Sequence, residues 1–196
     1  MRREFPVRCD AMSDTQNFLQ TPSSAPRLTS PGTGPAELEA IFRAALRAPE
    51  HAWLRPCGLL TIAGDRRQDF GRLLEKCLLV RDPAADDAAR AKALKAPLRA
   101  PLLVIVVARL SEHPKVPDLE QRLSAGCAAH AILLAAEACG YGGIWRTGDA
   151  AFDRNVMNAL GLADHEEIVG ILYLGTRDGA AKPLPELATG DFVSSW

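Results

Sequence analysis

A long alanine- and leucine-rich run that ends in a cluster of glycines constrains the fold of this chain more than any other feature. The run has helical spacing over roughly twenty residues up to Cys139. Between residues 127 and 138 it is apolar nearly all round, apart from His130 and Glu137. A helix with apolar residues on every side is normally buried, so we expect this one to be the central helix of the fold.

The segment that follows, residues 140–148, packs four glycines, a tryptophan and an arginine into nine positions. Glycine lets a ligand approach the main chain closely, Trp145 offers a flat apolar surface, and Arg146 offers a planar fork for a phosphate or a ring carbonyl. These properties indicate a slot for a flat, partly anionic cofactor. The structural alternative is a helix C-cap and a tight turn into a strand, with Trp145 in the core. The motif alone supports both equally.

Composition and charge exclude several classes of protein. The chain has 196 residues, of which 47% are hydrophobic and 24% charged, with a net charge of −1. It has no cationic cluster for a nucleic-acid backbone, and its longest apolar stretch, residues 101–108, is too short to span a bilayer. Five scattered cysteines without metal-ligand spacing indicate reduced thiols in a cytoplasm. Neither His113 nor His165 has a second ligand at suitable spacing, so we expect no metal site.

The pattern along the chain predicts one mixed α and β domain over residues 17–196, after a disordered tail at 1–16 in which Met12 is an alternative start. Residues 20–35 have the composition of a loop, with four prolines and two glycines. The C-terminal arm, residues 182–196, ends in apolar residues that a partner subunit would cover. We expect Trp53 and Trp145 in the core. The helical periodicity predicts helices from residue 35 to about 49, over 70–78, over about twenty residues up to 139, and over 150–161. A further helix, exposed to solvent, is predicted over 81–99. Strands are predicted over 59–63, 102–107 and 167–175.

Four blocks of sequence occur in an order that resembles the nitroreductase family of FMN-dependent reductases, in particular its short YdjA-type branch. The blocks are residues 43–51, residues 100–103, residues 113–117 with Glu120 and 124–127, and residues 140–148; the closing stretch 168–176 also fits. The resemblance covers residues 17–196, and the blocks together are far more specific than any one of them.

The resemblance implies an α+β fold with a central, mostly antiparallel sheet flanked by helices, in an intertwined homodimer. It also implies an enzyme that binds FMN at the subunit interface, takes hydride from NADH or NADPH, and reduces a nitroaromatic, a quinone or a similar acceptor. Residues 135–140 would lie on the nicotinamide side. The implied FMN contacts are Pro22, Ser23, Ser24, Arg47, His51, Trp145, Arg146 and Thr147; no acid or base catalyst is assigned.

Taken alone, some of these residues have ordinary structural explanations. Arg47 is typical of an arginine near a helix C-terminus, where the helix dipole favours a cation, and His51 is typical of a capping or packing residue. Arg146 has a stronger case, because Trp145 and the glycines surround it.

One departure from the family pattern favours a second hypothesis. Where the family has two consecutive arginines that hold the FMN phosphate, this chain has Pro22 and Ser23. The loss of two charge-assisted contacts weakens phosphate binding unless Arg27 or Arg146 compensates. The alternative is therefore a catalytically degenerate homodimer of the same fold that binds another flat ligand or a protein partner.

Overall fold

The computed structural model describes residues 13–196; residues 1–12, which hold most of the predicted tail, lie outside the described residues. The chain divides into two compact units, Met1–Ser23 with Ala181–Trp196, and Ser24–Ala180. In the first unit, helix α1 (Asp14–Gln20) begins with a capping box between Ser13 and Gln16, and a short 3₁₀ turn, η2, spans Thr189–Asp191. The division into a tail and one domain from residue 17 stays a prediction.

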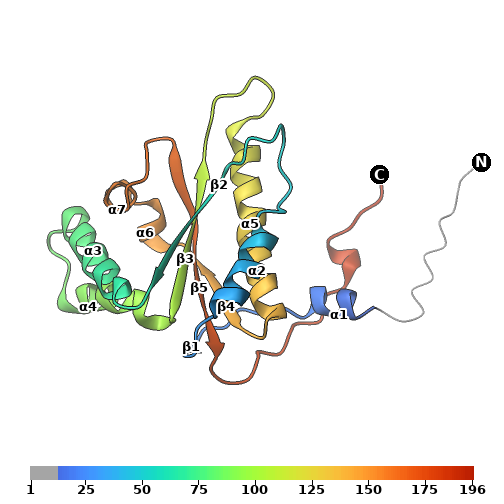
Figure 1. Cartoon of the computed structure of the whole chain (residues 1–196), viewed down its shortest axis with the longest axis horizontal. Coiled ribbons are helices and arrows are strands. Elements are labelled where there is room, and N and C mark those ends of the chain that lie inside the picture. Colours follow the sequence, from blue (N-terminus) through green and yellow to red (C-terminus); the bar gives the residue numbers. More distant parts are fainter. Residues whose placement is uncertain (1–12) are drawn as a thin grey trace, which may run out of the picture. The chain divides into compact units, whose positions relative to one another are not determined.

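The second unit is built on a five-stranded sheet in which every pairing is antiparallel (Figure 1). Four strands follow the order β1-β5-β3-β2, and β4 pairs with β5. The α+β fold class with a central antiparallel sheet flanked by helices is confirmed. The strands are β1 (Leu28–Thr29), β2 (Cys57–Ala63), β3 (Leu102–Arg109), β4 (Gly142–Arg146) and β5 (Glu166–Arg177).

Strand β3 is buried on both faces, as its unbroken apolar sequence predicts. Leu103, Ile105 and Val107 point to one hydrophobic core, whereas Leu102, Val104 and Val106 point to another. This alternation with a period of two follows from strand geometry. The sheet therefore separates two cores that are each closed by helices.

Helices α2 (Pro35–Ala45) and α5 (Asp118–Ala138) cover one face of the sheet (Figure 1). The other face is covered by α3 (Arg66–Arg81), the 3₁₀ turn η1 (Ala96–Arg99), α6 (Gly148–Phe152) and α7 (Arg154–Ala159), with α4 (Asp87–Lys95) packed on α3. No helix among residues 13–196 is long and apolar enough to cross a bilayer.

Two predicted helices differ from those observed. The single solvated helix predicted over 81–99 is wrong: α3 ends at Arg81, and Asp86 then caps α4 by accepting a hydrogen bond from the Ala89 amide at 2.7 Å. The helix predicted over 150–161 is interrupted at Asp153, whose carboxylate caps α7 through the Asn155 amide at 2.8 Å. In both places a side chain that satisfies free amides starts a new helix.

Burial of α5 is one-sided in this chain. Its buried positions include Ala125, Ala129 and Ile132, which face the sheet. Leu119 and Leu123 are more than half exposed, and the thiol-bearing Cys127 is also at the surface. The apolar residues on the outer side of this helix are therefore not covered within one copy of the chain.

The close packing of α3 against α4 gives a test of the fold. A Cβ at Gly71 would collide with the main-chain carbonyl of Leu94. Gly71→Ala should therefore destabilise the protein by about 1–3 kcal/mol, although alanine is normally the better helix former. Urea denaturation measures this free energy of unfolding.

Gly126→Ala on α5 is the matched control. Its added methyl group would meet only the Trp145 ring, at an ordinary 3.9 Å. This variant should be as stable as the wild type or more stable. Equal stability of the two variants would contradict the packing described between α3 and α4.

Candidate functional site

The glycine-rich segment begins as a helix C-cap. Gly140 has a left-handed φ of +83°, and the Tyr141 amide donates to the Ala136 carbonyl at 2.9 Å, which ends α5. The structural alternative for this segment is thus correct in its C-cap and strand, because the chain turns directly into β4, and Trp145 packs against a core.

Gly142 and Gly143 serve packing. A side chain at Gly142 would meet Ala25 and Leu28, and one at Gly143 would meet Leu133 and Leu174. The expectation that all the glycines of this segment floor one planar cavity is therefore wrong for these two. Gly148, by contrast, has no neighbour within 4 Å of an added Cβ.

Trp145 and Arg146 point to opposite faces of the sheet. The Trp145 indole lies against Gly170, where even a single added methyl group would overlap it, and packs in the core under α5. The Arg146 guanidinium lies over the Tyr173 ring, 5.8 Å from its centroid, on the other face. The two side chains cannot line one slot within a single chain, because neighbouring residues of a strand alternate.

Arg146 opens into a cavity of about 600 Å³, which we call the basic cavity. It lies between α3, α4, η1, the segment after β4 and strand β5. Its apolar wall includes Leu74, Leu78, Ala93, Val156 and Ile171. Its polar residues are Arg81, Lys92, Arg99, Arg146, Thr147, Asp149 and Tyr173.

The charges around the basic cavity do not cancel. Arg81 donates to the buried Asp153 at 2.8 Å and to Asp149 at 3.3 Å, so these groups satisfy one another. Among the described residues, Lys92, Arg99 and Arg146 form no ion pair with a carboxylate. Three positive charges therefore remain uncompensated.

Arg146 has an unsatisfied donor as well as an unpaired charge. Its Nε is buried and has no hydrogen-bond acceptor. Burial raises the pKa of the Tyr173 hydroxyl, and the nearby charges of Arg146 and Arg99 act to lower it. A buried donor without a partner is costly, so this end of the cavity favours an acceptor or an anion.

Arg47 and His51 lie elsewhere, next to the end of α2. Arg47 lines a groove of about 470 Å³ between α2 and α5, together with Leu123, Cys127 and His130. His51 Nδ1 lies 3.0 Å from a carboxylate oxygen of Glu120. The structure therefore does not bring Arg47 and His51 together with Arg146 and Thr147.

The N-terminal candidates divide between the two units of the chain. Pro22 and Ser23 belong to the first unit, and Ser24 begins the second. In the second unit, the amide of the adjacent Ala25 donates to the Gly143 carbonyl at 2.9 Å, which ties this segment to β4.

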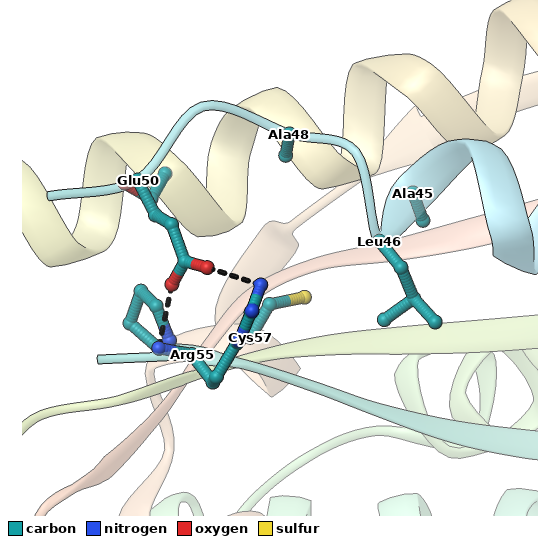
Figure 2. A pocket seen from close by; sticks show the side chains of 8 residues that line it. Ala45, Leu46, Ala48, Glu50, Arg55 and Cys57 are labelled. Atoms are coloured by element: carbon teal, nitrogen blue, oxygen red, sulfur yellow. Dashed lines mark hydrogen bonds and ion pairs between the residues drawn. The ribbon is translucent and has the colours of Figure 1, made fainter. Parts of the chain in front are cut away.

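The loop after α2 is strained and held by one carboxylate. Ala52, Trp53 and Arg55 all have left-handed φ values between 53° and 58°, which are rare for residues with a side chain. Glu50 accepts hydrogen bonds from the Arg55 amide at 2.6 Å and from its guanidinium at 2.5 Å, as Figure 2 shows beside the Cys57 thiol. Trp53 is 76% exposed, with the Arg55 guanidinium over its ring, so its expected place in the core is wrong.

Lys92 and Arg99 are site candidates that sequence reasoning missed. Both lie in residues 81–99, where the dense charges were interpreted as a solvated helix face. Only the packing of α4 and η1 beside β5 turns these residues toward a shared cavity. Pro97, two residues before Arg99 in η1, was the available sequence signal that one regular helix does not run through this stretch.

No group of three His, Cys, Asp or Glu side chains within residues 13–196 is arranged to hold a metal ion.

Comparison with known proteins gives a consistent picture. The model of the nitroreductase family matches residues 29–176. A protein of Escherichia coli K12 named as an NAD(P)H nitroreductase, YdjA, is 42% identical over 163 residues, covering 83% of this chain and 88% of its own. A Haemophilus influenzae protein, also named as an NAD(P)H nitroreductase, is 31% identical over 183 residues, which are 92% of this chain and 98% of its own.

Solved structures share the fold at lower identity. A nitroreductase-like protein of Bacillus cereus is 19% identical with a TM-score of 0.79, over 95% of this chain and 97% of its own. A Bacteroides fragilis nitroreductase solved with bound FMN is 19% identical with a TM-score of 0.72, over 94% of this chain and 100% of its own. The fold and the site thus define an antiparallel α+β sheet protein with a basic cavity beside the sheet. The chain belongs to the nitroreductase family, and its similarity to YdjA places it with the YdjA-type members.

The Glu50 clamp gives a prediction about the strained loop. Glu50→Ala removes two hydrogen bonds from a largely buried carboxylate and should destabilise the protein by about 1–3 kcal/mol. Glu39→Ala removes an exposed pair with Arg43 on α2 and should change stability by less than about 1 kcal/mol. Thermal denaturation of both variants measures the difference, and equal effects would show that the clamp does not restrain the loop.

The thiols offer a test of the pocket drawn in Figure 2. Burial raises the pKa of Cys57 to about 11, an effect that the nearby Arg109 charge only partly offsets. Since the thiolate is the nucleophile, iodoacetamide at pH 8 should label the exposed Cys139 well before Cys57. Labelling of Cys57 should accelerate as the pH rises toward 11. Peptide mass mapping measures each rate, and labelling of Cys57 as fast as Cys139 at pH 8 would contradict the burial of Cys57.

Proposed function

We propose that this protein is an FMN-dependent oxidoreductase that takes hydride from NADH or NADPH and reduces a small-molecule acceptor such as a nitroaromatic or a quinone. Membership of the nitroreductase family supports the proposal, as do the names of the relatives from Escherichia coli and Haemophilus influenzae. The neighbour from Bacteroides fragilis binds FMN in its crystal structure.

The observation that carries the proposal is the buried Arg146 Nε without an acceptor at the end of the basic cavity. A flavin ring carries carbonyl oxygens and ring nitrogens along one edge, which would satisfy this donor. The cavity of about 600 Å³ is within the usual size of a small-molecule site, and its apolar wall suits the flat ring. The residues present therefore fit FMN.

Bound FMN would supply hydride acceptance and electron transfer to the second substrate. The protein's own contribution is to bind and orient it. Arg146 and Thr147 lie at the cavity after β4, and Leu74, Leu78 and Ile171 exclude water from it. Trp145 acts from the opposite face of the sheet, where its indole fills the space over Gly170 and fixes β4.

A homodimer with shared sites accounts for the separation of the predicted contacts. Arg47 and His51 cannot reach the basic cavity of their own chain across the sheet, so we assign them to the cavity of a second copy. The surface around Arg47 supports this assignment, because it carries apolar side chains that are exposed. Leu46 lies next to Arg47, and Leu119 and Leu123 lie on α5; each is at least 60% exposed. Apolar side chains grouped in this way are typical of an interface.

The replacement of the phosphate-binding arginines by Pro22 and Ser23 supports the second candidate, a catalytically degenerate homodimer that binds a different flat ligand or a protein partner. Flavin that binds at high occupancy but is reduced by neither NADH nor NADPH would favour that candidate. We also place the protein in the cytoplasm because its described cysteines are all unpaired thiols.

The absorbance spectrum of purified protein tests the proposal directly, since protein that stays colourless after incubation with FMN and gel filtration would contradict it. Arg146→Ala should weaken FMN binding roughly 10- to 100-fold, because a charge-assisted contact is lost. The melting temperature of the FMN-free variant should change by less than about 4 °C, because no protein partner of Arg146 Nε is lost.

The exposed Arg43→Ala is the control, with unchanged FMN binding expected. If FMN affinity and the melting temperature of the FMN-free Arg146→Ala protein both fall sharply, Arg146 is a packing residue and its assignment to the cofactor is wrong.

A further inference from the structure

Arg99 lies at the same end of the basic cavity as Arg146 but comes from a different element. It is the last residue of η1, between the buried Pro97 and the buried Ala100. Arg67 donates to the Ala100 carbonyl at 2.7 Å, so the main chain next to Arg99 is anchored. Arg99 itself is exposed and lines the cavity from this anchored turn.

The groups that face this end of the cavity leave its charge uncompensated. From β5 comes the neutral Tyr173, from the end of β4 comes Arg146, and from α6 comes Asp149. Asp149 is paired with Arg81, so it does not neutralise Arg99 or Arg146. The charges of both arginines act to lower the pKa of the Tyr173 hydroxyl, which burial raises.

We propose that Arg99, together with Arg146, supplies the positive charge that stabilises reduced FMN over oxidised FMN in the basic cavity. The inference rests on the proposed function. Hydride transfer moves one proton and two electrons from the dihydronicotinamide, which leaves the nicotinamide oxidised with a positive charge and gives the flavin one additional negative charge. A cation in a cavity with apolar walls stabilises that added charge more than it would in water.

Two arginines are needed because their roles differ. Arg146 presents a buried donor that an oxidised flavin already satisfies, so its removal should weaken binding of both redox states. Arg99 is exposed and has no unsatisfied buried atom, so it costs little in the oxidised state. Its effect should therefore appear mainly on reduction, when the additional negative charge arises.

The test is the midpoint potential of FMN bound to the full-length protein, measured by equilibration with a reference dye. Arg99→Gln should lower the affinity for reduced FMN relative to oxidised FMN by about tenfold, which corresponds to a two-electron potential roughly 30 mV more negative. Arg99→Lys should restore part of this shift, because it keeps the charge. Lys95, the last residue of α4, is a nearby cation that does not line the cavity. Lys95→Gln should therefore leave the potential unchanged.

Fluorescence quenching gives the affinity of each variant for oxidised FMN, and this affinity should change less than threefold in Arg99→Gln. A potential for Arg99→Gln that equals that of Lys95→Gln overturns the inference while FMN binding by the wild type still supports the proposed function. An equal loss of affinity for both redox states assigns Arg99 a structural role and also overturns it. Arg99→Met, which keeps the aliphatic stem, repeats the measurement if the glutamine variant folds poorly. A wild type that binds no FMN overturns the proposed function itself.

Discussion

The position of β5 between its neighbours is the constraint on which the rest of the structure depends. This strand pairs with β1, β3 and β4, and its register against β4 places Arg146 opposite Ile171. A shift of one residue would turn Arg146 toward the alanine-rich face of α5 and Trp145 toward the basic cavity. The fit of the Trp145 indole over Gly170 opposes such a shift, since any larger residue than glycine would overlap it. Packing on one face therefore fixes the chemistry on the other.

The basic cavity is a place where stability is not optimised. A buried guanidinium nitrogen without an acceptor, that of Arg146, is unfavourable in the protein alone. Elsewhere the chain pairs such groups closely, as in Arg122 with Glu167 at 2.7 Å and Arg109 with Glu166 at 2.9 Å. The contrast indicates that the charge of the cavity is reserved for a ligand.

On the opposite face of the sheet, the side that carries α2 and α5, apolar side chains are left exposed. The Glu50 clamp holds a strained loop that exposes Trp53, and the outer side of α5 leaves leucines uncovered. A second copy that covers this surface would bring Arg47 and His51 to a cavity that they cannot reach in their own chain. The homodimer that we propose would account together for the positive charges on one face and the apolar residues on the other.

The sequence determined the fold class and most of the elements that build it. The continuous β-branched run of β3 predicted a strand covered on both sides, and the proline and glutamate near residue 35 predicted the start of α2. These predictions are confirmed because they depend on local periodicity and capping, which are written in neighbouring residues. The breaks near Asp86 and Asp153 were missed, because a side chain that caps a helix competes with residues that favour continuing it.

What only the tertiary structure decided is which side chains share a space. From the sequence, Trp145 and Arg146 are neighbours in one slot, but strand pairing sends them to opposite cores. Arg99 and Lys92 read as solvated charges, but the packing of η1 and α4 beside β5 brings them to Arg146. The physical reason is that the pattern of neighbouring residues predicts which element a residue belongs to and whether it is buried. Whether Arg99 and Arg146, 47 positions apart, line the same cavity depends instead on the strand register and on how the helices pack on the sheet.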